Sequence, residues 1–212
     1  TGTETAIIFI HGNSTNSTIW KHQFNAEKLN DFPMIAIDLP GHGKSSKMES
    51  YSVPEIIEVL AETIQEYDNV VLVGHSLGGH FAIETLPYLQ RCKGLFVFGT
   101  SPVKTPINLE EAFLPDERMA LMFQKNLNES EIEDFAKFVS DEHDVTNFDF
   151  KEGIRSTDSN FREGIGFSVA KEELADEAEI LRNYKTPIAV LQGERDGLVN
   201  FEYVNNLPIA SL

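Results

Sequence analysis

The sequence has a single cysteine, Cys92, among its 212 residues. One cysteine excludes an internal disulfide and fits a reducing compartment, so a cytoplasmic location is expected. No apolar run approaches the roughly 18 residues that a membrane-spanning helix requires, and no signal peptide is visible. The chain starts at Thr1 without a methionine, which leaves room for upstream residues that have been removed.

Basic residues are also scarce: 17 lysines and arginines stand against 34 acidic residues, a formal net charge of −17. This balance disfavours nucleic acid and anionic membranes, whose binding depends on Lys and Arg. No metal or cofactor is expected either. His75 and His80 are five residues apart with no third ligand nearby, and no glycine-rich stretch has phosphate-loop spacing. The expected binding partner is therefore a small molecule. The sequence does not determine the oligomeric state.

Short apolar runs of strand length recur along the chain, as is typical of strands buried on both faces of a parallel sheet. Helical patterns separate most of them, which predicts βαβ units and an α/β fold with a mostly parallel sheet flanked by helices. The predicted strands are Ala6 to Ile10, Met34 to Ile37, Val70 to Val73, Leu95 to Phe98 and Ile188 to Leu191.

The alternation stops between Pro102 and Tyr184, in a charged stretch rich in phenylalanine. Asn128 and Glu131 form a capping-box pattern there, like Ser52 and Glu55 before an earlier helix. We predict a helical cap over residues 103–183, inserted into a core made of residues 1–102 and 184–212. Most of its phenylalanines are expected to pack internally.

A nucleophile elbow is predicted at residues 74 to 78, Gly-His-Ser-Leu-Gly, directly after a β-branched run. In this pattern Ser76 occupies a strained turn that exposes its hydroxyl at the end of a strand. Gly74 and Gly78 allow the close approach of strand and helix, and His75 lies inside the turn. The following helix directs its N-terminus at the position where an oxyanion would form.

Two backbone amides are candidates for the oxyanion hole. One belongs to Leu77, the residue after the nucleophile. The other belongs to Asn13, because Gly12 lets the chain turn after the first predicted strand so that this amide faces Ser76. The alternative for this segment is an ordinary strand-ending turn.

The expected acid is Asp196, which follows the last predicted strand through Gly193. Serine followed by aspartate is the chain order of α/β-hydrolases. Glu194 is a competitor, and a solvated acidic loop is the plain alternative.

The base is missing, because all six histidines precede Asp196 and the order calls for one after it. His75 is expected to point away from the Ser76 hydroxyl. His42 lies in a loop with no reason to meet both Ser76 and Asp196, and His143 is expected on the surface of the cap.

Four motifs in this order resemble the α/β-hydrolase superfamily across nearly the whole chain. They are His11-Gly12-Asn13, the stretch from Asp38 to Ser45, Gly74 to Gly79, and Gly193 to Asp196. The resemblance implies an α/β-hydrolase fold with Ser76 as nucleophile, Asp196 as acid, and Asn13 and Leu77 as oxyanion donors. His11 to Ser14, Gly78-Gly79-His80 and Gly99 to Val103 are similar to the α/β-hydrolase-type N-acyl-homoserine lactonases.

The chain departs from the family pattern at both ends. The family has further strands before Ala6, and a final strand and a loop carrying the base after the acid. We therefore expect both ends to be truncated and the catalytic histidine to lie beyond Leu212.

The function predicted from these residues is a serine hydrolase of carboxylic esters or lactones, including N-acyl-homoserine lactones. A non-catalytic ligand-binding protein or an inactive fragment is the alternative suggested by the absent base. Other chemistry on the same scaffold, such as cofactor-free haloperoxidation, is a third.

Overall fold

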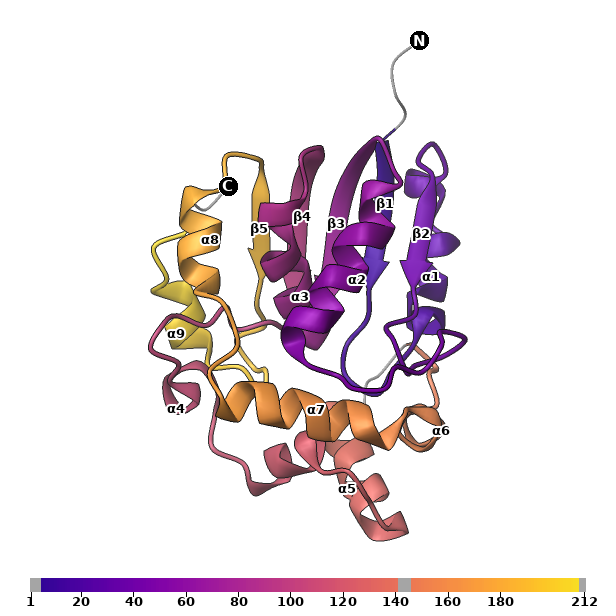
Figure 1. The fold of residues 1–212 in the computed structure, drawn as a ribbon, viewed down its shortest axis with the longest axis vertical. Helices are drawn as coiled ribbons and strands as arrows, with labels where there is room; N and C mark the ends of the chain where they lie inside the picture. Colours follow the sequence, from indigo (N-terminus) through magenta and orange to yellow (C-terminus); the bar gives the residue numbers. More distant parts are fainter. Residues whose placement is uncertain (1–4, 141–145, 210–212) are drawn as a thin grey trace.

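A computed structural model describes residues 5–140 and 146–209. The described residues form one parallel sheet of five strands in the order β2-β1-β3-β4-β5 (Figure 1). The strands are β1 (Thr5–Ile10), β2 (Met34–Ile37), β3 (Asn69–His75), β4 (Cys92–Phe98) and β5 (Ile188–Leu191). The five predicted strands are thus confirmed, with β1, β3 and β4 longer than predicted.

Side chains alternate between the two faces of the sheet, and each face packs in a separate cluster. Ile8 and Ile10 of β1 are fully buried against the larger cluster, which includes Phe81 and Leu181 from the flanking helices. Phe9, between them, packs on the opposite face against Trp20, with ring centroids 5.1 Å apart. Burial on both faces explains why these strands are continuous apolar runs in the sequence.

Helices α2 (Val53–Gln65), α3 (Leu77–Thr85) and α8 (Glu177–Asn183) lie on one face of the sheet (Figure 1). The other face carries α1 (Lys21–Phe24) and the 3-10 helix η1 (Ser17–Trp20). The capping box predicted at Ser52 is confirmed: its amide donates to Glu55 Oε2 at 2.8 Å and its hydroxyl accepts from the Glu55 amide at 3.3 Å.

The segment between β4 and β5 covers the carboxyl ends of the strands (Figure 1). Its elements are α4 (Leu109–Ala112), η4 (Glu117–Phe123), α5 (Glu129–Val139), α6 (Phe150–Ser156) and α7 (Ser159–Ala170). The capping box at Asn128 is confirmed. Helix α8 ends the segment and packs beside α3, with Leu181 in the main core. The division of the chain into a core and a cap domain stays a prediction. His143, which is expected on the surface of the cap, lies outside the described residues.

A last short helix, α9 (Phe201–Asn205), follows the loop after β5. In the described parts of the chain, no helix is long and apolar enough to span a bilayer. The carboxyl ends of β1, β3, β4 and β5 all meet the segment that precedes α8, and in a parallel sheet this is the edge where reacting groups gather. The candidate site lies there.

Candidate active site

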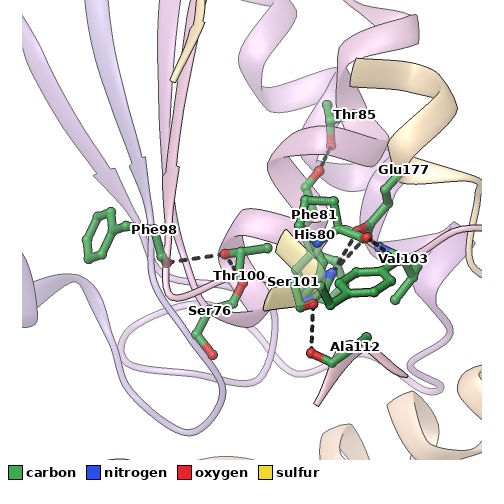
Figure 2. A network of polar contacts seen from close by, with 12 residues as sticks. Ser76, His80, Phe81, Thr85, Phe98, Thr100, Ser101, Val103, Ala112 and Glu177 are labelled. Atoms are coloured by element: carbon green, nitrogen blue, oxygen red, sulfur yellow. Dashed lines mark hydrogen bonds and ion pairs between the residues drawn. The ribbon is translucent and has the colours of Figure 1, made fainter. Parts of the chain in front are cut away.

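Ser76 lies in the sharp turn between β3 and α3, with φ 52° and ψ −125°. Its amide donates to the Phe98 carbonyl at 3.1 Å, and its carbonyl accepts from the Gly79 amide at 2.8 Å and the Thr100 hydroxyl at 3.0 Å. Figure 2 shows the Thr100 hydroxyl between the Ser76 and Phe98 carbonyls, to which it donates, with the Ser76 side chain directed away from Thr100. The backbone of the turn is therefore fixed, while the Ser76 hydroxyl bonds to no other group that the structure describes.

The glycines of the elbow are required by the close approach of three segments. A Cβ on Gly74 would lie 2.6 Å from the Gly78 carbonyl oxygen, and one on Gly78 would collide with the carbonyl oxygens of Ile10 and His11. Any side chain at either position would push α3 away from the sheet. The strand–turn–helix geometry expected of a nucleophile elbow is thus present at Ser76.

The loop after β1 lies against Ser76. A Cβ on Gly12 would be 3.2 Å from Ser76 Cβ. The next residue, Asn13, lines the same pocket as Ser76 and Leu77. Within the described residues, the main-chain amides of Asn13 and Leu77 donate to no other group of the chain. Two free amides beside a hydroxyl, one at a helix N-terminus, can stabilise a developing negative charge.

The Asn13 side chain serves a different purpose. Its Nδ2 donates to the Met122 carbonyl in η4 at 2.9 Å, and its Oδ1 accepts from the Ser14 hydroxyl at 2.9 Å. The loop that carries the candidate oxyanion donor is thereby hydrogen-bonded to the segment between β4 and β5. The sequence contained no signal for this contact across 109 positions.

Asp196 lies in the loop after β5, and its carboxylate is held in place. Oδ1 accepts from the amides of Leu198 at 2.8 Å and Val199 at 2.9 Å, while Oδ2 accepts from Gln192 Nε2 at 2.9 Å. Asp196 lines an outer cleft of about 460 Å³ together with His75 and Ser76. Glu194 is exposed and does not line this cleft, so the geometry favours Asp196 as the oriented acid.

His11 and His42 are buried structural residues. His11 Nε2 accepts the Leu39 amide at 3.0 Å, and His42 Nε2 accepts the Ser14 amide at 3.2 Å. Their Nδ1 atoms lie 2.8 and 3.0 Å from the Gly12 and Pro40 carbonyls, respectively. Burial lowers the pKa of His11 to about 4 and that of His42 to about 3. Both rings are therefore neutral and committed to backbone groups at neutral pH.

His75 is the histidine nearest to the elbow in sequence. Its ring packs against Phe98 with centroids 4.9 Å apart, and burial lowers its pKa to about 4, although the Asp196 carboxylate opposes this shift. Among the described residues, no histidine ring hydrogen-bonds to the Ser76 hydroxyl. The expectation that the base lies elsewhere stays a prediction.

A narrow apolar pocket of about 70 Å³ extends from Ser76 under the segment between β4 and β5. Apolar side chains form much of its wall, including Leu109, Phe113, Met119, Met122 and Phe123. Phe113 and Phe123 are thus exposed to the pocket, whereas Phe135 and Phe161 are fully buried in packing. The expected packing is thus seen for Phe135 and Phe161, and Phe123 both packs against the main core and lines the pocket.

A buried polar cluster on α3 was not recognised from the sequence. His80 Nδ1 lies 2.9 Å from both carboxylate oxygens of Glu177 (Figure 2), and the Val103 amide donates to Glu177 Oε2 at 2.9 Å. Burial opposes protonation of His80, but the Glu177 charge outweighs it and raises the His80 pKa. Burial first, and then the Glu177 charge, raises the pKa of Glu84 to about 8.

A sequence signal existed for part of this cluster, because Ser76, His80 and Glu84 follow one another at intervals of four residues. For Glu177, which is 97 positions away from His80, there was none. In the described parts of the chain, no three His, Cys, Asp or Glu side chains gather in a way that could hold a metal ion.

Comparison with known proteins gives consistent matches. The model of the alpha/beta hydrolase family matches residues 7–197. Among curated relatives, a 2-succinyl-6-hydroxy-2,4-cyclohexadiene-1-carboxylate synthase of Enterobacter sp. (strain 638) is 38% identical over 79 residues, which are 36% of this chain and 30% of that protein. A pimeloyl-[acyl-carrier protein] methyl ester esterase of Wigglesworthia glossinidia brevipalpis is 35% identical over 97 residues, 45% of this chain and 36% of its own.

These matches span about a third of the length of the curated relatives. A solved structure is similar over the whole chain: the N-acyl homoserine lactonase AidH in complex with N-butanoyl homoserine, with a TM-score of 0.89 and 28% identity. The similarity covers 100% of this chain and 78% of the AidH chain. The fold, the elbow at Ser76 and the match across residues 7–197 agree, and the chain belongs to the alpha/beta hydrolase family.

Proposed function

We propose that the protein is a serine hydrolase that cleaves a carboxylic ester or lactone through an acyl-enzyme. The observation that carries this proposal is the Ser76 turn, where a hydroxyl with no hydrogen-bond partner among the described residues adjoins two free amides and an apolar pocket. Similarity to AidH supports lactones as the substrate class, including N-acyl-homoserine lactones.

In the proposed mechanism, Ser76 Oγ attacks the substrate carbonyl while a histidine accepts its proton. The Asn13 and Leu77 amides stabilise the oxyanion, which collapses to an acyl-enzyme as the histidine gives its proton to the leaving alcohol oxygen. Water then attacks the ester bond to Ser76 and releases the acid. Asp196 orients the histidine, which we place beyond Leu212.

The narrow pocket suits the apolar part of such a substrate, because apolar walls with a few converging polar groups are typical of small-molecule sites. We further propose that residues 103–183 act as a cap over this pocket and that the protein works in the cytoplasm, consistent with its single, buried cysteine.

The test is covalent labelling with a fluorophosphonate, followed by mass spectrometry of the intact protein and by hydrolysis of p-nitrophenyl esters. The full-length protein is expected to gain one adduct and to turn over esters. Ser76→Ala should abolish both, whereas Ser46→Ala, at an exposed serine, should change neither. Turnover retained in Ser76→Ala would refute the mechanism.

The alternative, a ligand-binding protein without catalysis, is favoured by one observation: no described histidine hydrogen-bonds to Ser76. The labelling experiment separates the two functions. A protein that binds esters reversibly, without an adduct or turnover, would establish the binding function.

A further inference from the structure

The proposed nucleophile Ser76 caps α3, and two residues of that helix, His80 and Glu84, belong to the polar cluster described above. Ser76, His80 and Glu84 lie on successive turns of one helix face, and all three line the narrow apolar pocket. Eight residues of helix correspond to about 12 Å along its axis. The pocket therefore presents a carboxyl group about two turns away from the serine hydroxyl.

The Glu84 carboxyl has an unused hydrogen-bonding position. The residue is only 7% exposed, and its Oε1 has no hydrogen-bond partner in the part of the chain that the structure describes. A buried polar atom without a partner costs free energy, so such atoms are uncommon and call for an explanation. Because Glu84 also lines the pocket, a small rotation of its carboxyl would let a ligand group there supply the missing partner.

The neighbouring charges do not use this position. His80 and Glu177 pair with each other at 2.9 Å, and Glu177 also accepts the Val103 amide. With its pKa raised to about 8, Glu84 carries a proton at neutral pH. A neutral carboxyl can both donate and accept a hydrogen bond, which suits a hydroxyl or carbonyl oxygen.

On the basis of the proposed hydrolase function, we propose that the preferred substrate carries a hydroxyl or carbonyl oxygen on its acyl chain, about two helical turns from the scissile carbonyl. Glu84 is the residue that hydrogen-bonds this oxygen. The inference rests on the unpartnered Oε1, its burial and its position in the same pocket as Ser76.

Such a site discriminates between substrates for a simple reason. A plain alkyl chain that reaches Glu84 leaves its Oε1 unpaired. A chain with an oxygen at the right distance satisfies it. Sites built to hydrogen-bond a substrate group reject analogues that lack it much more strongly than apolar pockets reject a missing methylene.

The experiment measures kcat/KM of the full-length protein for p-nitrophenyl esters from butanoate to decanoate. Each ester is tested with and without an ω-hydroxyl group on the acyl chain. At one intermediate chain length, the hydroxylated ester should be preferred by about tenfold or more. Butanoate, too short to reach Glu84, should show no preference. Glu84→Leu should remove or invert the preference, Glu84→Gln should retain part of it, and Glu62→Gln, at an exposed glutamate, should leave it unchanged.

Two outcomes would overturn the inference: no preference at any chain length, or a preference that survives in Glu84→Leu. Hydrolysis of the butanoate ester serves as the control for an intact fold and catalytic site. If no ester is turned over at all, the proposed function fails instead. Binding of a medium-chain alkanol and the corresponding α,ω-diol then tests Glu84 on its own, with the diol expected to bind more tightly to the unsubstituted protein and equally to Glu84→Leu.

Discussion

At the scale of single residues, Ser76 combines backbone strain with a free hydroxyl. A non-glycine residue at positive φ costs about 1–3 kcal/mol, and such strain persists only where the surroundings impose it. Here the Phe98 carbonyl and the Thr100 hydroxyl impose it through the Ser76 main chain. The side chain is thus positioned through the main chain, and its hydroxyl makes no hydrogen bond within the described residues.

Asp196 and Glu194 are two residues apart, but only one carboxylate is fixed. Because the Leu198 and Val199 amides orient Asp196, Asp196→Asn should leave the fold intact and lower kcat by roughly 10⁴, the cost of losing the orienting acid in a serine triad. Glu194→Gln should change kcat little. Steady-state kinetics on both variants decides between them, and the reverse ranking would identify Glu194 as the acid.

At the scale of elements, Arg162 of α7 connects segments of the chain that are distant in sequence. The residue is only 4% exposed. Its guanidinium donates to the carbonyls of Gln124 at 3.0 Å, Lys125 at 3.1 Å and Ile154 at 3.2 Å. One side chain therefore holds the two residues that follow η4 and the last turn of α6 together.

We expect Arg162→Met to lower the free energy of unfolding by about 2–5 kcal/mol, because it leaves buried carbonyls without donors. Arg155→Met is the matched control: Arg155 is exposed and pairs with Glu129, and a surface pair screened by water should change the free energy of unfolding little. Urea unfolding at neutral pH measures both. Equal losses in the two variants would show that the Arg162 contacts are not essential.

The same elements show what a sequence can predict. Strands and helix caps depend on residues within a few positions of each other, such as Ser52 and Glu55, and they were predicted with nearly correct bounds. The elbow is equally local. Contacts between Asn13 and Met122, or between His80 and Glu177, join segments about 100 positions apart. They depend on how the segment after β4 folds back over the sheet, and no local pattern encodes that path.

At the scale of the whole molecule, buried histidines couple stability to pH. The folded pKa values of His11, His42 and His75 are lowered from 6.5 to about 4, 3 and 4. Their contribution is fully present above pH 6.5 and is lost as the pH falls toward their folded values, by up to about 1.4 kcal/mol per pH unit for each ring. The folded pKa of Glu84 is raised from 4.5 to about 8, and that of His80 is also raised. The stabilisation that these two groups contribute has the opposite pH dependence and is lost as the pH rises.

The protein should accordingly be most stable near neutral pH and lose stability more steeply on the acid side. Urea unfolding from about pH 4 to about pH 9 measures this profile. On the acid side, His42→Gln should reduce the slope of the free energy of unfolding against pH by the contribution of about one proton. His22→Gln, at an exposed histidine, should leave this slope unchanged. An acid limb of the same slope in both variants would assign the loss to other groups.

The contacts that hold the segment between β4 and β5 over the candidate active site have a consequence for evolution and engineering. Asn13 and Arg162 bind main-chain carbonyls of Met122, Gln124, Lys125 and Ile154 rather than their side chains. A carbonyl is present whatever residue occupies the position. Side chains such as Met122 and its neighbour Phe123 can therefore be exchanged to reshape the pocket, while the hydrogen bonds that anchor the backbone persist. New substrate preferences are in this way accessible by single substitutions that leave the attachment in place.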